Sequence, residues 1–221
     1  HTSFFDGRQT WKVPDGTAHF LEHCVFSRDE QGGLLGHLSE LGASANAYTT
    51  HTHTLYYFTA ADHFSESLDL YLNAVMNPYL ENDRVESEKP VILAELDQYL
   101  DDPDNRSYQT LVELLYDYHP VRYDIGGHAD SVKMITSDDL KRVWASFYQP
   151  RMMTLTLVGD IDEYAILERL TERLTPYKTV KHQIQASMPL ETAQPAGRLK
   201  QLQMDVTAPS FIIGIKDPYF N

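Results

Sequence analysis

Cysteine, basic residues and long apolar runs are scarce in this 221-residue sequence. Cys24 is the only cysteine, so no disulfide can form within the chain. Lysine and arginine total 18 against 32 acidic residues, and the resulting net charge of -14 argues against nucleic-acid or anionic-membrane partners. No apolar run approaches the roughly 18 residues of a membrane-spanning helix. We expect a cytoplasmic protein without nucleic-acid or membrane partners.

The composition is that of a folded protein, because hydrophobic residues make up 42% of the chain. We predict a first domain over residues 1–175 and a polar, proline-containing linker over 176–198. Residues 199–221 would begin a second, truncated domain. Its two predicted strands, 199–205 and 210–215, cannot form a domain by themselves.

Hydrophobic periodicity and capping signals place the elements of the first domain. A strand and a Pro14-Asp15-Gly16 turn are expected within residues 1–16, and β-structure is expected at 46–59 and 152–158. Pro90 should bend the fourth predicted helix or mark its start, and a loop is expected over 119–134. The predicted helices cover about residues 17–27, 33–41, 62–77, 82–100, 106–118, 137–148 and 163–174.

The first predicted helix contains His19-Phe20-Leu21-Glu22-His23. Histidines four apart lie about one turn apart on one helix face, so both rings can reach one zinc ion. Glu22 lies on nearly the same face, where its carboxylate can hold a water molecule. This H-x-x-E-H order is typical of the inverzincin metallopeptidases. A histidine-bearing surface helix is the alternative interpretation.

A catalytic zinc site usually needs a third protein ligand. Glu95 is the best candidate, because it lies among apolar residues on a predicted helix, where an unpaired carboxylate is costly. A salt bridge or a partly exposed position would explain Glu95 equally well.

These residues resemble the pitrilysin, insulysin and mitochondrial processing peptidase family, and most closely its small bacterial processing-peptidase-like members. Glu95 follows His23 by 72 residues, and Glu88 matches a second acidic position seven residues before it. The stretch Leu41–Thr49 is similar to the family's Gly-Ala-x-x-Asn-Ala-x-Thr segment. Gly126-Gly127 fits a later landmark.

The resemblance implies a zinc endopeptidase that hydrolyses short or unfolded peptides. His19, His23 and Glu95 would bind Zn²⁺, and Glu22 would be the general base. Glu88 lies two turns from Glu95, roughly 10 Å along a helix, so it is predicted to support catalysis rather than to bind the same ion.

The resemblance also implies an α+β fold, an antiparallel sheet with helices packed on one side. Asn46 and Ala47 would lie on a strand edge that holds extended peptide by main-chain pairing. Family members pair two such domains as a clamshell. A second homologous domain or subunit should therefore close the chamber, and the isolated chain could be inactive. The bacterial members imply a bacterial cytoplasmic location.

Two other functions compete with the peptidase. Some family members have lost the zinc motif and act as structural or partner subunits, but His19, Glu22, His23 and Glu95 are intact here. S-ribosylhomocysteine lyases share H-x-x-E-H but use a downstream cysteine ligand, and no cysteine follows Cys24. On a helix, Cys24 would point about 100° away from the zinc face, which indicates a buried thiol.

Overall fold

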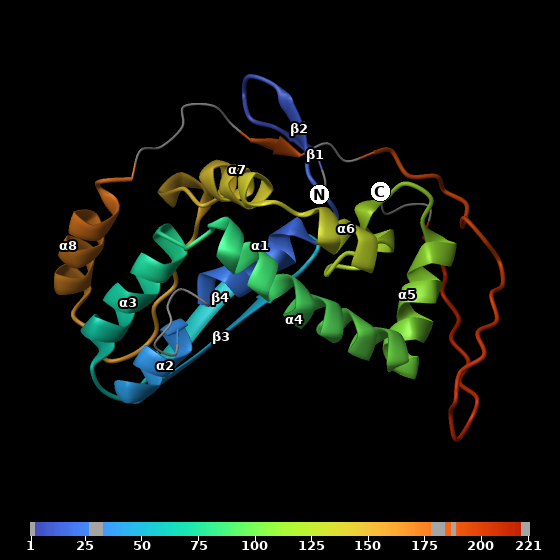
Figure 1. Cartoon of the computed structure of the whole chain (residues 1–221), viewed down its shortest axis with the longest axis horizontal. Helices are drawn as coiled ribbons and strands as arrows, with labels where there is room; N and C mark the ends of the chain where they lie inside the picture. Colours follow the sequence, from blue (N-terminus) through green and yellow to red (C-terminus); the bar gives the residue numbers. More distant parts are fainter. Residues whose placement is uncertain (1–2, 27–32, 178–183, 187–188, 218–221) are drawn as a thin grey trace.

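The computed structural model describes residues 3–26, 33–177, 184–186 and 189–217, and it has the predicted α+β class (Figure 1). The α-helices are α1 (Thr17–Phe26), α2 (Gly33–Glu40), α3 (Phe64–Met76), α4 (Asn82–Asp101), α5 (Pro103–Leu115), α6 (Ala129–Met134), α7 (Ser137–Phe147) and α8 (Glu163–Leu174). The 3₁₀ turns are η1 (Pro120–Arg122) and η2 (Pro150–Met152). The strands are β1 (Ser3–Phe5), β2 (Thr10–Lys12), β3 (Ala43–Thr49), β4 (Thr54–Ala60) and β5 (Gln185–Ala186).

The strands form two small antiparallel sheets. One has the order β2-β1-β5, and the other is the β3–β4 hairpin. The described residues 3–16 thus contain two short strands where one was predicted, followed by the expected turn with Gly16 at φ +89°. The β5 strand lies inside the segment predicted as a linker and pairs with β1, although the two are far apart in sequence.

Helix α1 lies at the centre of the molecule, with the β3–β4 hairpin on one side and α4 and α7 on the other (Figure 1). Its start is confirmed, and its predicted last residue, Ser27, lies outside the described residues. Phe20, Leu21 and Cys24 belong to a core shared with α4 and α7, and Val25 packs into a second core with α2 and α3. Two cores therefore fix the orientation of α1.

The β3–β4 hairpin confirms the predicted β-structure and lengthens it at both ends. Gly42 is the last residue of the connection between α2 and β3. Its φ of +71° is a conformation that glycine adopts without strain. The register pairs Ala43 with Ala60 and Thr49 with Thr54. Side chains alternate along β3 between an exposed face and a partly buried face.

Helix α4 runs unbroken through Pro90, which confirms the helix predicted over about 82–100 and excludes the alternative that it begins near this proline. Pro90 lacks an N–H and cannot bond the carbonyl of Glu86. The proline side chain is exposed, so that carbonyl can meet solvent. The buried residues Val85, Ile92 and Leu96 continue the apolar stripe across it, and their packing outweighs one missing bond.

Two predictions about the following segment needed correction. Helix α5 begins at Pro103 rather than Arg106, because Asp102 caps it by accepting a hydrogen bond from the Asp104 amide at 3.0 Å. The segment predicted as a loop over 119–134 contains η1 and α6. Helix α6 has six residues, too few for a hydrophobic period to show in the sequence.

Helices α7 and α8 confirm their predictions, and Thr136 caps α7 with a reciprocal bond to Asp139. Residues 152–158 are not a strand, which contradicts the prediction. In the described part of the chain this segment has no neighbouring strand, and an alternating pattern becomes a strand only where a ladder partner exists.

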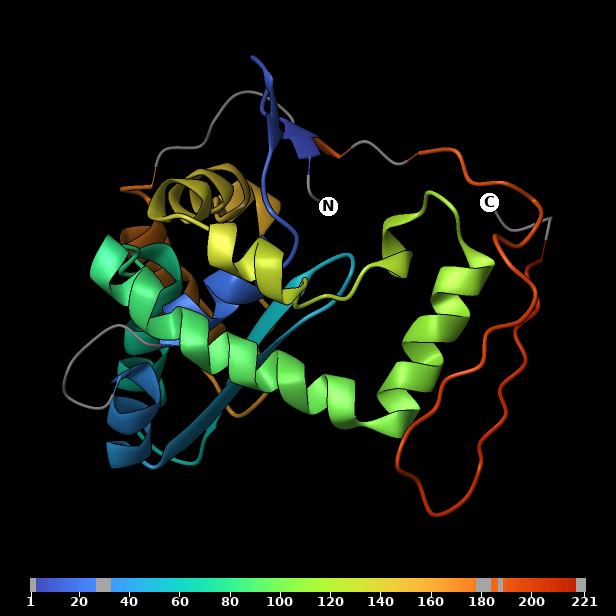
Figure 2. The same ribbon diagram turned by 45° about the vertical axis from the view of Figure 1, so that its right-hand side comes forward.

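Residues 189–217, here called the C-terminal strap, run along α5 in both views (Figures 1 and 2). The strands predicted at 199–205 and 210–215 are not formed there. Instead the strap is held to α5 by a hydrogen bond from the Gly197 amide to the Leu114 carbonyl at 2.9 Å and by a Lys200–Glu113 ion pair at 3.0 Å. The proposed domain boundaries stay predictions. No described helix has the length and apolar character to cross a membrane.

Candidate functional site

The two histidines of the motif are brought together on one face of α1. The helix begins directly after Gly16, and Thr17 fixes its first turn by donating to the Pro14 carbonyl at 2.6 Å. The rings of His19 and His23 then lie one turn apart, with their centroids separated by 4.7 Å. The predicted helical spacing is confirmed.

Helix α4 supplies the third side chain. Oε2 of Glu95 lies 3.2 Å from Nε2 of His23, and Oε1 lies 3.7 Å from Nε2 of His19. Among the described residues Glu95 pairs with the two histidines rather than with a lysine or arginine, and its side chain is 26% exposed. The α1–α4 packing brings together the three residues that the sequence analysis grouped.

The three side chains fit a zinc ion. One ligand atom from each of His19, His23 and Glu95 lies within 4.8 Å of the other two. Ligands at about 2.0–2.1 Å from a tetrahedral zinc are about 3.4 Å apart, so the two measured separations lie on either side of the required value. Two imidazoles and a carboxylate are also a donor set found in catalytic zinc sites.

Glu22 is buried beside these ligands, with only 8% of the residue exposed. One carboxylate oxygen, Oε2, accepts a hydrogen bond of 2.6 Å from the hydroxyl of Thr49, at the end of β3. A side chain on the hairpin therefore holds the carboxylate of a residue on α1. Thr49 ends the stretch that resembles the family, but its position in the sequence predicts no contact with Glu22.

Glu88 lies behind His23, away from the open side of the site. Its Oε1 is 3.1 Å from Nδ1 of His23, and its Oε2 is 3.3 Å from the guanidinium of Arg84. Glu88 is not among the described residues that line the cleft. The supporting role of Glu88 stays a prediction, and the atom that it contacts is Nδ1 of His23, the position that carboxylates occupy behind metal-binding histidines.

The two histidines differ in their electrostatics. Burial alone would lower the pKa of His23, but the hydrogen bond that its Nδ1 donates to Glu88 and the charge of Glu95 outweigh it and raise that pKa. Burial and the neighbouring His23 lower the pKa of His19. Nδ1 of His19 is buried with no hydrogen-bond partner among the described residues. A neutral ring, the form that binds a metal, is therefore favoured at His19.

The site opens into a cleft of about 610 Å³. One wall consists of α1 and five consecutive residues of β3, Ala45 to Thr49, which include the predicted substrate-binding pair Asn46 and Ala47. In the described part of the chain, β4 is the only strand that pairs with β3. Asn46 and Ala47 therefore lie beside the metal-ligand cluster on a strand with one edge free of strand pairing.

The opposite wall is polar and was not predicted. It comes from the end of α4, from α5 and from the loop before α6, and Figure 2 shows α5 standing apart from the hairpin. Tyr99 donates a hydrogen bond of 2.8 Å to Oε1 of Glu95. The i, i+4 spacing of these two residues on one helix could have revealed this pair. The other residues of this wall are Asn105, Tyr108, Gln109, Asp124, Ile125 and Gly126.

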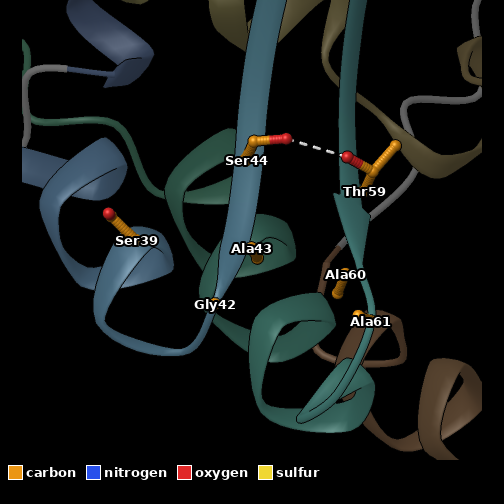
Figure 3. A pocket seen from close by; sticks show the side chains of 7 residues that line it. All are labelled: Ser39, Gly42, Ala43, Ser44, Thr59, Ala60 and Ala61. Atoms are coloured by element: carbon orange, nitrogen blue, oxygen red, sulfur yellow. Dashed lines mark hydrogen bonds between the residues drawn. The ribbon is translucent and has the colours of Figure 1, made fainter.

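A second hollow lies at the far end of the hairpin, where β3 begins and β4 ends (Figure 3). Small side chains line it, and the hydroxyls of Ser44 and Thr59 bond across it at 2.8 Å. None of its described lining residues is titratable. This hollow therefore differs from the first cleft, which contains two histidines and several carboxylates.

Cys24 is fully buried in the core, as predicted, and takes no part in the ligand cluster. Burial raises the pKa of its thiol to about 12, so it stays protonated and unreactive.

Comparison with known proteins identifies relatives of this chain. Residues 9–128, just over half of it, match the family described as Insulinase (Peptidase family M16). A Bacillus subtilis protein named "Uncharacterized zinc protease YmfH" is 37% identical over 206 residues, covering 92% of this chain and 48% of that protein. The "Probable mitochondrial-processing peptidase subunit beta" of Arabidopsis thaliana is 29% identical, covering 79% of this chain and 34% of that protein.

A solved structure has a similar fold to this chain. The crystal structure of a putative M16-like peptidase from Alicyclobacillus acidocaldarius matches with a TM-score of 0.82 and 35% identity, covering 89% of this chain and 46% of that one. This chain spans about half the length of the two bacterial relatives. The family match, the identity to a zinc protease and the shared fold together show that the chain belongs to the insulinase family of peptidases, family M16.

Proposed function

We propose that this chain carries the zinc centre of an endopeptidase that hydrolyses short or unfolded peptides. The observation that supports this most is the cluster of His19, His23 and Glu95 ligand atoms within 4.8 Å, in a cleft that also contains Glu22. A zinc ion held by these three residues would lower the pKa of a water molecule and polarise the scissile carbonyl.

Glu22 is the proposed general base. Its carboxylate lies in the same cleft as the ligands and is withdrawn from bulk solvent. It takes a proton from the attacking water and returns it to the leaving amine. Glu88 holds the ring of His23 from behind, so its proposed role is to position a ligand rather than to contact substrate.

Substrate binding is assigned to the β3 side of the cleft. A peptide that pairs with the free edge of β3 near Asn46 and Ala47 must be extended, which favours short or unfolded chains over folded proteins. The pairing uses main-chain groups, so it imposes little sequence preference by itself.

A second homologous domain or subunit is the proposed partner. The chain covers about half of its bacterial relatives, and the polar wall formed by α5 leaves the cleft open. Positioning of reacting groups accounts for several kcal/mol of a barrier, so we expect the isolated chain to be slow even when its ligands are intact.

The metal assignment is tested first. In the full-length protein, His19→Ala and His23→Ala should each abolish zinc retention measured by atomic absorption, because two ligands remain where three are needed. The control is His63→Asn, which removes an exposed imidazole and keeps a residue that tolerates the left-handed φ of 50°. Unchanged zinc in both alanine variants would place the metal elsewhere.

Glu22→Gln tests the base in the same preparations. It should keep its zinc and lose at least about 100-fold in kcat on a fluorogenic peptide, since the amide cannot take a proton. A variant that retains zinc and turns over normally contradicts the assignment. A full-length protein that binds zinc but cleaves no member of an unstructured peptide library favours the alternative, a non-catalytic partner subunit.

A further inference from the structure

Thr49 is the most informative residue of the cleft that the proposed chemistry does not yet use. Its hydroxyl lies 2.6 Å from Oε2 of Glu22, and this is the only hydrogen bond that the Glu22 side chain makes in the described part of the chain. Glu22 is 8% exposed, so few water molecules could replace that bond. A buried carboxylate with one partner takes its orientation from that partner.

The direction of the bonds is fixed by the groups involved. An ionised carboxylate only accepts, so Thr49 must donate its single proton to Glu22. The hydroxyl of Thr54, 3.2 Å away, must then donate to Thr49. Thr49 and Thr54 are directly paired in the hairpin register, so the β3–β4 pairing itself sets this relay.

We infer that Thr49 is a positioning residue, which aims the carboxylate of Glu22 from the strand that also binds substrate. Ala45 to Thr49 line the cleft without interruption, so the free edge of β3 and the hydroxyl that holds Glu22 move as one element. The hairpin sets the distance between the peptide and the base. This inference rests on the proposed function, because it takes Glu22 as the base.

The test compares three variants of the zinc-loaded, full-length protein. Thr49→Val removes the hydroxyl and keeps a β-branched side chain. Thr49→Ser restores the hydroxyl. Thr59→Val is the matched control, because it makes the same change in the same hairpin at the hollow far from the ligands (Figure 3). Peptide turnover is measured as kcat and KM separately, and zinc affinity by chelator competition.

Thr49→Val should lower kcat by about 10- to 100-fold, since small misplacements of a reacting group cost this much. KM should change by less than about twofold, because ground-state binding is untouched. Zinc affinity should equal the wild-type value, Thr49→Ser should recover most of kcat, and Thr59→Val should match the wild type.

A double variant separates positioning from a general structural effect. In a Glu22→Gln background, Thr49→Val should lower the residual rate no further, since residues that act as one unit are not additive. Equal losses in both backgrounds, a raised KM alone, weakened zinc binding, or failure of serine to restore kcat would each overturn the inference. An inactive Glu22→Gln beside a fully active Thr49→Val would refute this inference alone, whereas an active Glu22→Gln would refute the proposed base.

Discussion

The two histidines of the site differ in the partner of their Nδ1 atom. His23 has a buried carboxylate at its Nδ1, whereas Nδ1 of His19 has no partner in the described residues. A ring held from behind presents its other nitrogen at a fixed angle, and loss of such partners commonly weakens metal binding. We therefore expect His23 to contribute more to a preformed site than His19 does.

The first prediction concerns Glu88. Glu88→Gln should weaken zinc binding by about 10-fold or more, because the amide keeps the size of the side chain but loses the charge that orients His23. Chelator competition measures the affinity. Glu86→Gln is the control, since Glu86 lies on the same helix and its side chain is 67% exposed.

The same experiment also separates the two roles proposed for Glu88. At saturating zinc the kcat of Glu88→Gln should return to near the wild-type value, as expected of a residue that acts through a ligand. A kcat that stays low with zinc fully bound would instead assign Glu88 a direct part in the chemistry.

At the scale of elements, the junction before α1 places the ligand helix. Gly127 has φ +79°, and a Cβ there would lie 2.5 Å from the carbonyl oxygen of Asp15 and 2.8 Å from Oγ of Ser131. The loop before α6 thus touches the turn that starts α1. Glycine is required there both by backbone conformation and by space.

The second prediction compares two glycines. Gly127→Ala should destabilise the protein by at least about 1–3 kcal/mol, the usual strain of a left-handed residue, with the overlap adding to it. Gly36→Ala should instead stabilise it by about 0.5–1 kcal/mol, because Gly36 lies within α2 with open space around its Cβ position. Urea unfolding measures both, and equal effects would contradict the close approach at Gly127.

The elements that sequence patterns predict well are those with local signals. Helix α7 has its capping box at Thr136, and α1 has its turn and its histidine spacing. The strand wrongly predicted at residues 152–158 lacked such a signal. Alternating apolar and polar residues indicate which face of a strand could be buried, but not whether a partner strand is present.

The residues of the candidate site also divide into those that local spacing predicts and those that it does not. The His19–His23 pair follows from helix geometry. The apolar surroundings of Glu95 made it the best third candidate but left a salt bridge equally possible, and the resemblance then favoured the zinc role, since spacing along the chain does not show that α1 and α4 pack together. The bond from Thr49 to Glu22 depends on how the hairpin lies on α1, which no local pattern encodes.

At the scale of the whole molecule, Glu191 anchors the C-terminal strap. Its carboxylate accepts hydrogen bonds from the backbone amides of Asp117, Tyr118 and His119 and from Lys216, at 2.7–3.1 Å. Burial would raise the pKa of Glu191, but the bonds from Lys216 and the three amides outweigh it and hold that pKa well below its ordinary value of 4.5. We therefore expect the strap to depend on this carboxylate being charged.

The third prediction follows from that depressed pKa. The charged carboxylate of Glu191 makes its full contribution to the free energy of unfolding above pH 4.5, the pKa of this group in the unfolded chain. That contribution is lost progressively as the pH falls below 4.5. Glu191→Gln should therefore be less stable than the wild type at pH 7, by about 1.5–3 kcal/mol. The difference between the two proteins should shrink between pH 4.5 and pH 2.5.

Urea unfolding in excess EDTA measures this difference without interference from metal release. Glu168→Gln is the control, an exposed glutamate on α8. A gap between Glu191→Gln and the wild type that stays constant as the pH falls would show that the lost stability does not come from the charge.

The strap also exposes apolar side chains, with Phe211 80%, Ile213 71% and Ile215 89% exposed. Exposed apolar clusters usually mark contact surfaces. Together with the half-length coverage of the bacterial relatives, this supports the proposal that a second domain or subunit packs against this half.

Because the proposed zinc ligands lie on both α1 and α4, a bound metal would also have a mechanical role. Glu95 is 72 residues from His23 in the sequence, so an ion bound by both would cross-link two distant parts of the chain and close a long loop. Such a cross-link favours only the folded chain, by about 2.7 kcal/mol when free zinc is 100 times its dissociation constant. The cleft would then be most rigid when it is able to react, and metal depletion would loosen the contact between its two ligand helices before it unfolds the rest of the molecule.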